Sequence, residues 1–98
     1  MDSNNSKLRV LIVDDDVHIA ELISLYMEKE GYETYEVHSG SDVMEAFKRF
    51  DPHIVLLDIM LPGVDGYQVC RQIRQLSNTP IIMLTAKGET FDKVLGLE

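Results

Sequence analysis

The chain has very little cysteine and few long apolar stretches, and each shortage excludes a class of protein. Its single cysteine, Cys70, cannot form a disulfide within the chain, which is typical of a reducing compartment. The apolar runs are too short for a membrane span, and the polar start of the sequence does not resemble a signal peptide. We therefore expect a cytoplasmic protein.

Basic residues are also scarce. Nine Lys and Arg residues oppose 17 Asp and Glu residues, which gives a formal net charge of −8. Nucleic acid and anionic membranes are bound by Lys and Arg patches, so this balance disfavours direct binding of either by the chain itself. A partner with a basic surface is the better expectation.

What the chain does contain is enough for one small domain. It has 98 residues, of which 45% are apolar and 27% charged, a composition that suits a globular protein with a modest core. Residues 1–7 form a polar N-terminal tail, and residues 8–98 are expected to form the domain. No low-complexity tract or linker indicates a second one.

Apolar strand-like runs alternate with segments of helical periodicity. The runs begin near Leu8, Tyr32, His53 and Pro80. Helices are predicted over residues 17–30, 41–50 and 65–76, and the start of another near residues 91–95. This alternation predicts an α/β fold, a doubly wound parallel sheet with helices on both faces, in which residues 32–37 form a half-exposed edge strand.

Each predicted helix carries an apolar stripe that we expect to face the sheet. The expected stripes are Ile19, Leu22, Ile23, Tyr26 and Met27 in the first helix, Val43, Met44 and Phe47 in the second, and Val69, Ile73 and Leu76 in the third.

Carboxylates follow two of the apolar runs directly. Asp14, Asp15 and Asp16 follow the first run, and Asp58 ends the third. In a parallel sheet both strand ends open at the same edge, so these side chains are expected to share one crevice. Two such charges about 4 Å apart repel by roughly 4 kcal/mol at an effective dielectric of 20, so the cluster needs a cation or protons. A hard divalent cation, Mg²⁺, fits this requirement best.

Three segments at successive strand ends resemble a known family. They are Leu11-Ile12-Val13-Asp14-Asp15-Asp16, the stretch from Val55 to Gly66, and Pro80-Ile81-Ile82-Met83-Leu84-Thr85-Ala86. Together they closely resemble the receiver domain of bacterial two-component response regulators, of the kind that precedes a DNA-binding output domain. The resemblance implies a flavodoxin-like (CheY-like) fold with strand order 2-1-3-4-5.

The resemblance also implies a role for each site residue. Asp58 would accept a phosphoryl group from a phosphohistidine on a sensor histidine kinase, and Thr85 would donate its hydroxyl to a phosphoryl oxygen. Asp15 would bind Mg²⁺ directly and Asp14 through metal-bound water, while Asp58 and the backbone carbonyl of Met60 would complete the metal site. These roles suit the residue types, since a carboxylate is a nucleophile at neutral pH and a hydroxyl stabilises the new phosphate.

Other residues near the motifs have structural interpretations. Asp16 is expected to cap the first helix, and Asp65 the third. Pro62, Gly63 and Gly66 are expected to shape the backbone of the loop.

Two other functions remain open at this point. Asp14-Asp15-Asp16 contains the Asp-x-Asp spacing of haloacid-dehalogenase-like Mg²⁺-dependent phosphohydrolases, although Val17-His18 lacks the threonine expected there and Asp58 would have no role. A binding module that is never phosphorylated is the other alternative, and intact Asp58, Asp15 and Thr85 disfavour it. A flavin carrier is disfavoured because the loop after the first strand is acidic.

The chain departs from the receiver pattern at its C-terminus, where the resemblance implies a fifth strand with a Lys-Pro pair and a fifth helix. Neither is present in the sequence, so the receiver is interpreted as C-terminally incomplete. We expect the edge of the strand Ile81–Leu84 to be exposed and to favour self-association. The resemblance implies that DNA would be reached only through an output domain absent from this chain, and that this output domain would regulate transcription.

Overall fold

The computed structural model describes residues 7–61 and 63–84. Within these residues strands and helices alternate as the sequence predicts. Their order is β1 Arg9–Val13, α1 Val17–Lys29, β2 Glu33–Val37, a 3-10 helix Gly40–Asp42, α2 Val43–Phe50, β3 Ile54–Asp58, β4 Met60–Leu61, β5 Val64–Asp65, α3 Gly66–Leu76 and β6 Ile81–Leu84. The helix predicted near residues 91–95 lies outside the described residues.

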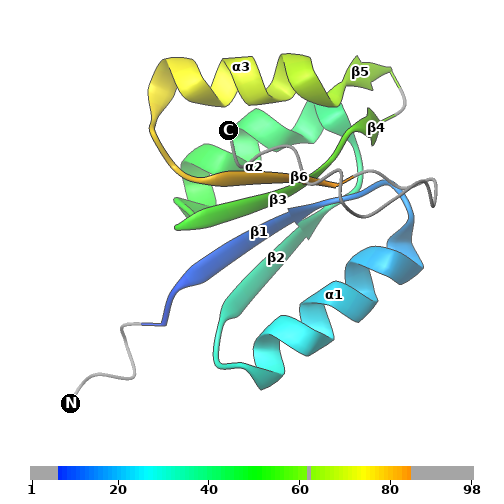
Figure 1. The fold of residues 1–98 in the computed structure, drawn as a ribbon, viewed down its shortest axis with the longest axis vertical. Helices are drawn as coiled ribbons and strands as arrows, with labels where there is room; N and C mark the ends of the chain where they lie inside the picture. Colours follow the sequence, from blue (N-terminus) through cyan, green and yellow to red (C-terminus); the bar gives the residue numbers. More distant parts are fainter. Residues whose placement is uncertain (1–6, 62, 85–98) are drawn as a thin grey trace.

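The main sheet has the order β2-β1-β3-β6, and all its strand pairs are parallel (Figure 1). This confirms the predicted order of the first four strands of a flavodoxin-like fold. Val13 lies opposite Leu57, and Leu57 opposite Met83, so β1, β3 and β6 end at nearly the same level. The loops that follow these strands therefore leave the sheet side by side.

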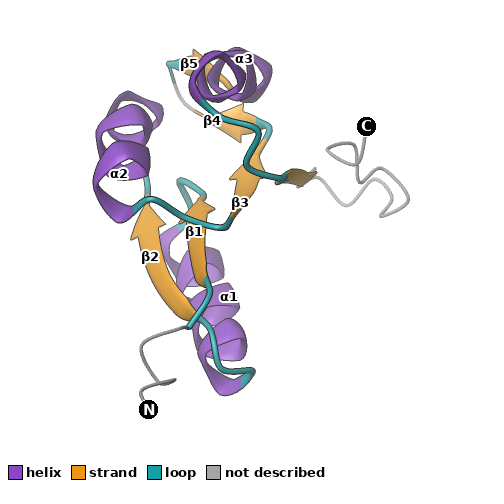
Figure 2. Ribbon diagram, turned by 90° about the vertical axis from the view of Figure 1, so that its left-hand side faces the viewer, coloured by secondary structure: helices purple, strands orange, loops and turns teal. Residues whose placement is uncertain are grey.

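Helices cover both faces of the sheet, as predicted: α1 lies on one face, and α2 and α3 lie on the other (Figure 2). The larger core cluster, on the side of α2 and α3, consists of Leu11, Val13, Val37, Val43, Phe47, Val55, Leu57, Leu61, Val69, Ile73, Ile81 and Met83. A smaller cluster with α1 contains Val10, Ile12, Ala20 and Leu56 as its buried residues. β1 and β3 contribute to both clusters because alternate side chains point to opposite faces.

The buried face predicted for α1 is wrong, because the buried positions are shifted by about one residue along the helix from the predicted stripe. Ala20 and Ser24 are its buried residues, with Ile23 and Met27 beside them, whereas Leu22 and Tyr26 are 66% and 63% exposed. The small side chains of Ala20 and Ser24 let the helix backbone approach the sheet, and the Ser24 hydroxyl lies 2.6 Å from that of Thr34 on β2. A prediction based on apolar residues alone therefore placed the large side chains of Leu22 and Tyr26 on the buried face of α1, although they lie on its outer side.

The other two helices follow their predicted stripes more closely. Val43 and Phe47 of α2 are buried, and Met44 packs against them. Val69 and Ile73 of α3 are buried, but the prediction for Leu76 is wrong, because this last residue of the helix is 54% exposed.

A short antiparallel ribbon follows β3 and was not predicted. Met60 pairs with Asp65 and Leu61 with Val64, so β4 and β5 connect β3 to α3. The ribbon turns at Gly63, whose φ of 77° suits glycine. It carries the chain away from the end of β3 before α3 begins.

No helix among the described residues is long and apolar enough to cross a membrane.

Candidate phosphoacceptor and metal site

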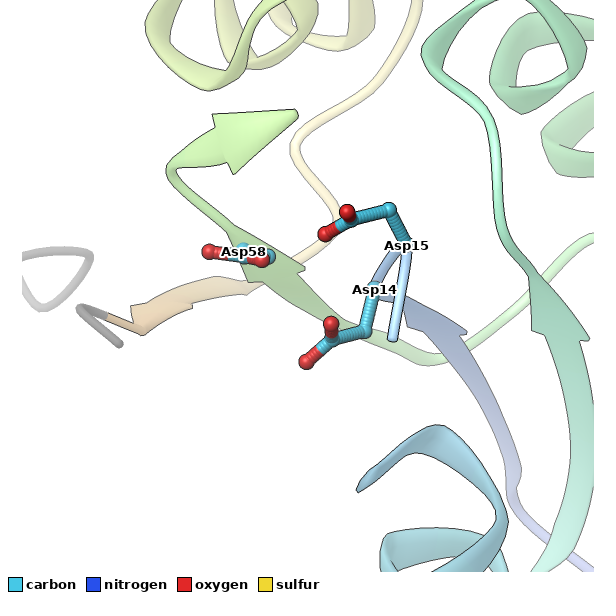
Figure 3. Close-up of side chains that lie close together, drawn as sticks. All are labelled: Asp14, Asp15 and Asp58. Carbon is cyan, nitrogen blue, oxygen red and sulfur yellow. The ribbon is translucent and has the colours of Figure 1, made fainter. Parts of the chain in front are cut away.

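Three carboxylates meet beyond the ends of two neighbouring strands. Asp58 is the last residue of β3, and Asp14 and Asp15 directly follow β1 (Figure 3). Since Val13 is paired with Leu57, Asp14 and Asp58 stand at equivalent positions of adjacent strands. One carboxylate oxygen from each of the three residues lies within 4.8 Å of the others, which confirms that they share one crevice.

The three carboxylates differ in exposure. Asp14 is 6% exposed and Asp58 4%, whereas Asp15 is exposed to solvent. None of the ion pairs within residues 7–61 and 63–84 involves any of them. Two carboxylates are thus buried next to a third without a basic side chain from the described part of the chain.

Asp14 and Asp58 are held by the same type of local turn. The backbone N–H of Asp16 donates to Oδ1 of Asp14 at 2.9 Å, and the N–H of Met60 donates to Oδ1 of Asp58 at 3.0 Å. Each side chain accepts from the residue two positions later, as short acidic side chains do in turns. The backbone of Asp14 is also fixed, because its N–H donates to the carbonyl of Val37 at 3.0 Å. No sequence pattern had indicated this link to β2.

Burial raises the pKa of the Asp58 carboxyl from 3.8 to about 6. The hydrogen bond from Met60 opposes this shift, but the nearby charges of Asp14 and Asp15 and a hydrogen bond with Asp14 reinforce it. Burial likewise raises the pKa of Asp14; the hydrogen bond from Asp16 lowers it, and the charges of Asp15 and Asp16 raise it. The site therefore retains protons more readily than ordinary aspartates do.

A hard cation would relieve the same repulsion. The three converging carboxylate oxygens are the ligand type that Mg²⁺ and Ca²⁺ prefer, and the exposed Asp15 leaves one side open to solvent for water ligands. The donor set of Asp14, Asp15 and Asp58 thus fits a divalent cation.

Of the remaining residues predicted near the site, Met60 and Asp16 are described by the structure and Thr85 is not. Met60 lies two residues beyond Asp58, with its backbone N–H on that carboxylate and its side chain 57% exposed. Thr85 lies outside the described residues; the residue before it, Leu84, is paired with Asp58. Asp16 caps α1, as predicted, by accepting from the N–H groups of His18 and Ile19.

Gly66 is part of the frame that holds the Asp58 loop. A Cβ at this position would lie 2.7 Å from Cα of Ile59 and 2.8 Å from the carbonyl oxygen of Asp58. The N–H of Gly66 donates to the carbonyl of Ile59 at 3.0 Å. Its predicted role in shaping the backbone is confirmed, and its close approach brings the start of α3 directly against the loop.

The response regulator receiver domain family model matches residues 10–98 of the chain. The chain belongs to this family. Its acidic cluster is typical of the phosphoacceptor site of a receiver domain, which is a signalling module rather than a catalytic enzyme. The phosphohydrolase alternative is therefore overturned. A receiver domain implies a histidine kinase as partner in general terms.

Solved structures agree with this assignment. The BeF3-activated N-terminal receiver domain of Klebsiella pneumoniae RstA is 35% identical, with a TM-score of 0.79, and the match covers 91% of this chain and 76% of that one. The receiver domain of the Francisella response regulator 1452 is 32% identical, with a TM-score of 0.79 and coverage of 93% and 76%. The N-terminal domain of a response regulator receiver protein from Methanoculleus marisnigri JR1 is 34% identical, with a TM-score of 0.76 and coverage of 84% and 69%.

Proposed function

We propose that Asp58 is the phosphoacceptor of this receiver domain and that it takes its phosphoryl group from a phosphohistidine of a sensor histidine kinase. The observation that supports this most directly is the position of Asp58: a buried carboxylate at a strand end, with one oxygen fixed by the Met60 N–H and two further carboxylates beside it. Oδ1 is occupied by that hydrogen bond, so Oδ2 is the better candidate for attack on phosphorus.

In the proposed step a carboxylate oxygen of Asp58 forms a bond to phosphorus while the bond from phosphorus to the histidine nitrogen breaks. The imidazole leaves with the electron pair of that bond, and Asp58 becomes an acyl phosphate. Asp58 must be ionised to act as the nucleophile, and with a pKa of about 6 most of it is ionised above neutral pH. The hydroxyl of Thr85 is proposed to donate to a phosphoryl oxygen.

We assign Mg²⁺ to the carboxylates of Asp14, Asp15 and Asp58 and to the backbone carbonyl of Met60, with Asp14 acting through water. Bound there, the cation would neutralise charge on the carboxylates and on the oxygens of the transferring group. The clustering of the three carboxylates supports this assignment.

Phosphorylation would control an output domain outside this chain, and through it transcription. We also propose that the domain spans residues 8–98, with a tail at 1–7, and that the protein is cytoplasmic. We further propose that it self-associates through the edge of β6. Light scattering over a concentration series tests the last point, and a monomer at every concentration would contradict it.

Intact-protein mass spectrometry after incubation with Mg²⁺ and a small acyl phosphate tests the phosphoacceptor. We expect one phosphoryl group per chain, released by hydroxylamine as acyl phosphates are, and none in Asp58→Asn. Asp65→Asn is the matched control, because Asp65 is an exposed helix cap that asparagine can replace. Labelling of Asp58→Asn at the parent level would reject the assignment.

A further inference from the structure

A groove between β2 and α2 shares no lining residue with the carboxylate site and has no role in the proposed phosphoryl transfer. Its volume is about 540 Å³, within the range of binding pockets. Residues from β2 form one wall, and residues from α2 form the other. β2 is an edge strand, so the groove runs along one side of the sheet. Figure 2 shows α2 above β2 at this side.

The backbone of β2 offers hydrogen-bonding groups to this groove. The N–H of Glu33 donates to the carbonyl of Leu8, and the carbonyl of Val37 accepts from Asp14. In a parallel ladder, alternate residues face the same neighbour, so Glu33, Tyr35 and Val37 direct their N–H and C=O groups towards β1. The corresponding groups of Thr34 and Glu36 point away from the sheet. Such an edge can pair with an added strand.

Next to this edge is an aromatic surface. The ring centroids of Tyr35 and Phe50 are 5.6 Å apart and tilted by 35°. Tyr35 is 52% exposed, a large fraction for an aromatic residue, and both rings line the groove. An apolar or aromatic side chain of an added strand could cover them.

The charges of the groove favour a basic occupant. Asp42 and Glu45 line it, with Arg49 as the only Lys or Arg among its lining residues. Glu36 also lines it, but its carboxylate lies 3.2 Å from Nε2 of His38. Arg49 and Glu45 are 3.6 Å apart, and their side chains are about three-quarters exposed. Such exposed ion pairs contribute little to stability, so a cation of the ligand can take the place of Arg49 beside Glu45. Asp42 has no ion pair within residues 7–61 and 63–84.

We propose that this groove binds an extended peptide segment that carries both basic and apolar or aromatic residues, as an additional strand on β2. Its backbone would pair with Thr34 and Glu36. Alternate side chains of the peptide would face α2, where apolar ones would cover Tyr35 and Phe50 and basic ones would meet Asp42 and Glu45. A second copy of this chain is a poorer occupant, because pairing β2 with itself would bring Glu33 and Glu36 of both copies together.

Fluorescence anisotropy with the full 98-residue chain tests the charge requirement. The probe is a labelled short peptide in which Lys and Val residues flank a central Tyr and are placed so that each face of the extended strand carries both types. We expect saturable binding that the double variant Asp42→Lys/Glu45→Lys weakens by about tenfold or more. The double variant Glu21→Lys/Glu30→Lys makes the same change of charge at two exposed positions in and after α1; it is the matched control and should change the affinity by less than about twofold. An equal loss of affinity in the control would mean that the peptide binds only through overall charge attraction, and this would overturn the proposal.

Hydrogen exchange tests the strand geometry. Peptide binding should slow exchange at the outward amides of Thr34 and Glu36 by about tenfold or more, and a peptide N-methylated at alternate residues should bind about tenfold more weakly. Binding without amide protection, or equal binding of the N-methylated peptide, would contradict strand addition. Protection that grows with protein concentration in the absence of peptide would instead assign the edge to a second copy. Absence of saturable binding by the Lys/Val peptide would also overturn the proposal.

Discussion

The loops that follow β1 and β3 begin in the same way and then diverge. In each, a buried aspartate accepts a hydrogen bond on Oδ1 from the N–H two residues later. The β1 loop then adds the exposed Asp15 and the helix cap Asp16, and enters α1 at once. The β3 loop passes through the β4–β5 ribbon and reaches α3 at Gly66.

The β1 loop therefore contributes mainly charge to the site, whereas the β3 loop depends mainly on its backbone geometry. The β1 loop brings three carboxylates close together, and two of these residues, Asp14 and Asp15, raise the pKa of Asp58 from across the crevice. The β3 loop has one carboxylate in the crevice, and its form depends on a backbone approach at Gly66 that a side chain would block. The same turn thus adds to a cluster of charge on one strand and holds a single buried carboxylate on the other.

The largest effect that we expect comes from filling the close approach in the β3 loop. Gly66→Ala should lower the free energy of unfolding by roughly 3 kcal/mol, because its Cβ would meet backbone atoms that cannot rotate away. Urea denaturation measures this. Gly63→Ala is the control: it has open space but a positive φ, so it should cost only about 1 kcal/mol. Equal costs would show that the approach is not tight in solution.

The next effect concerns pH. Folding raises the pKa of Asp58 from 3.8 to about 6, so the folded state holds this proton more tightly than the unfolded chain does. The contribution of Asp58 to stability is therefore fully present below about pH 4 and is lost as pH rises through 6. Without metal, Asp58→Asn should be more stable than the parent at pH 7.5 by roughly 2–3 kcal/mol.

Denaturation of both proteins in EDTA at several pH values checks this prediction. The advantage of Asp58→Asn should shrink towards pH 4, since the parent carboxyl becomes neutral there. Asp65→Asn, the same substitution at an exposed helix cap outside the carboxylate cluster, is the control. An advantage that does not change with pH would mean that amide packing, and not charge, is responsible.

A smaller effect is expected for metal binding by the β1 loop. Asp15→Asn removes an exposed carboxylate from the cluster while leaving the turns at Asp14 and Asp58 intact. The Mg²⁺ dissociation constant should rise by about tenfold or more, which corresponds to ~1.4 kcal/mol. Isothermal titration calorimetry measures it. Asp51→Asn, which removes one negative charge at the C-terminal end of α2, is the control. An equal rise of the Mg²⁺ dissociation constant in this variant would show that Asp15 is not a metal ligand.

The smallest effect belongs to the helix cap. Asp16→Ala should cost about 1 kcal/mol of stability, because the N–H groups of His18 and Ile19 lose their acceptor. Asp16→Asn retains an acceptor and should cost less. If labelling of Asp58 falls as sharply in Asp16→Asn as in Asp58→Asn, the division of roles within the β1 loop is wrong.

The resemblance of three motifs to receiver domains was sufficient to predict the order of the strands. The meeting of Asp14, Asp15 and Asp58 could be predicted from the residues themselves, because apolar runs ended in carboxylates and parallel strands open at one edge. The sequence was not sufficient for the face of α1. Ala20 and Ser24 carry little apolar signal, yet they decide how closely the helix approaches the sheet.

Two further features could not be read from sequence patterns. The β4–β5 ribbon has strands of two residues each, too short to show any periodicity. The groove beside β2 arises from the packing of α2 against an edge strand, and its residues are spread over Tyr35 to Phe50 without a motif. Both depend on tertiary contacts.

The paired turns at Asp14 and Asp58 have a consequence for the entropy of side-chain ordering at this site. A free aspartate samples several rotamers, and ordering a flexible side chain at a binding site costs roughly 0.5–1.5 kcal/mol. Here the backbone N–H groups of Asp16 and Met60 already hold both carboxylates in place. Much of the ordering entropy of these two side chains is thus lost during folding, so a ligand of these carboxylates would meet a preorganised site.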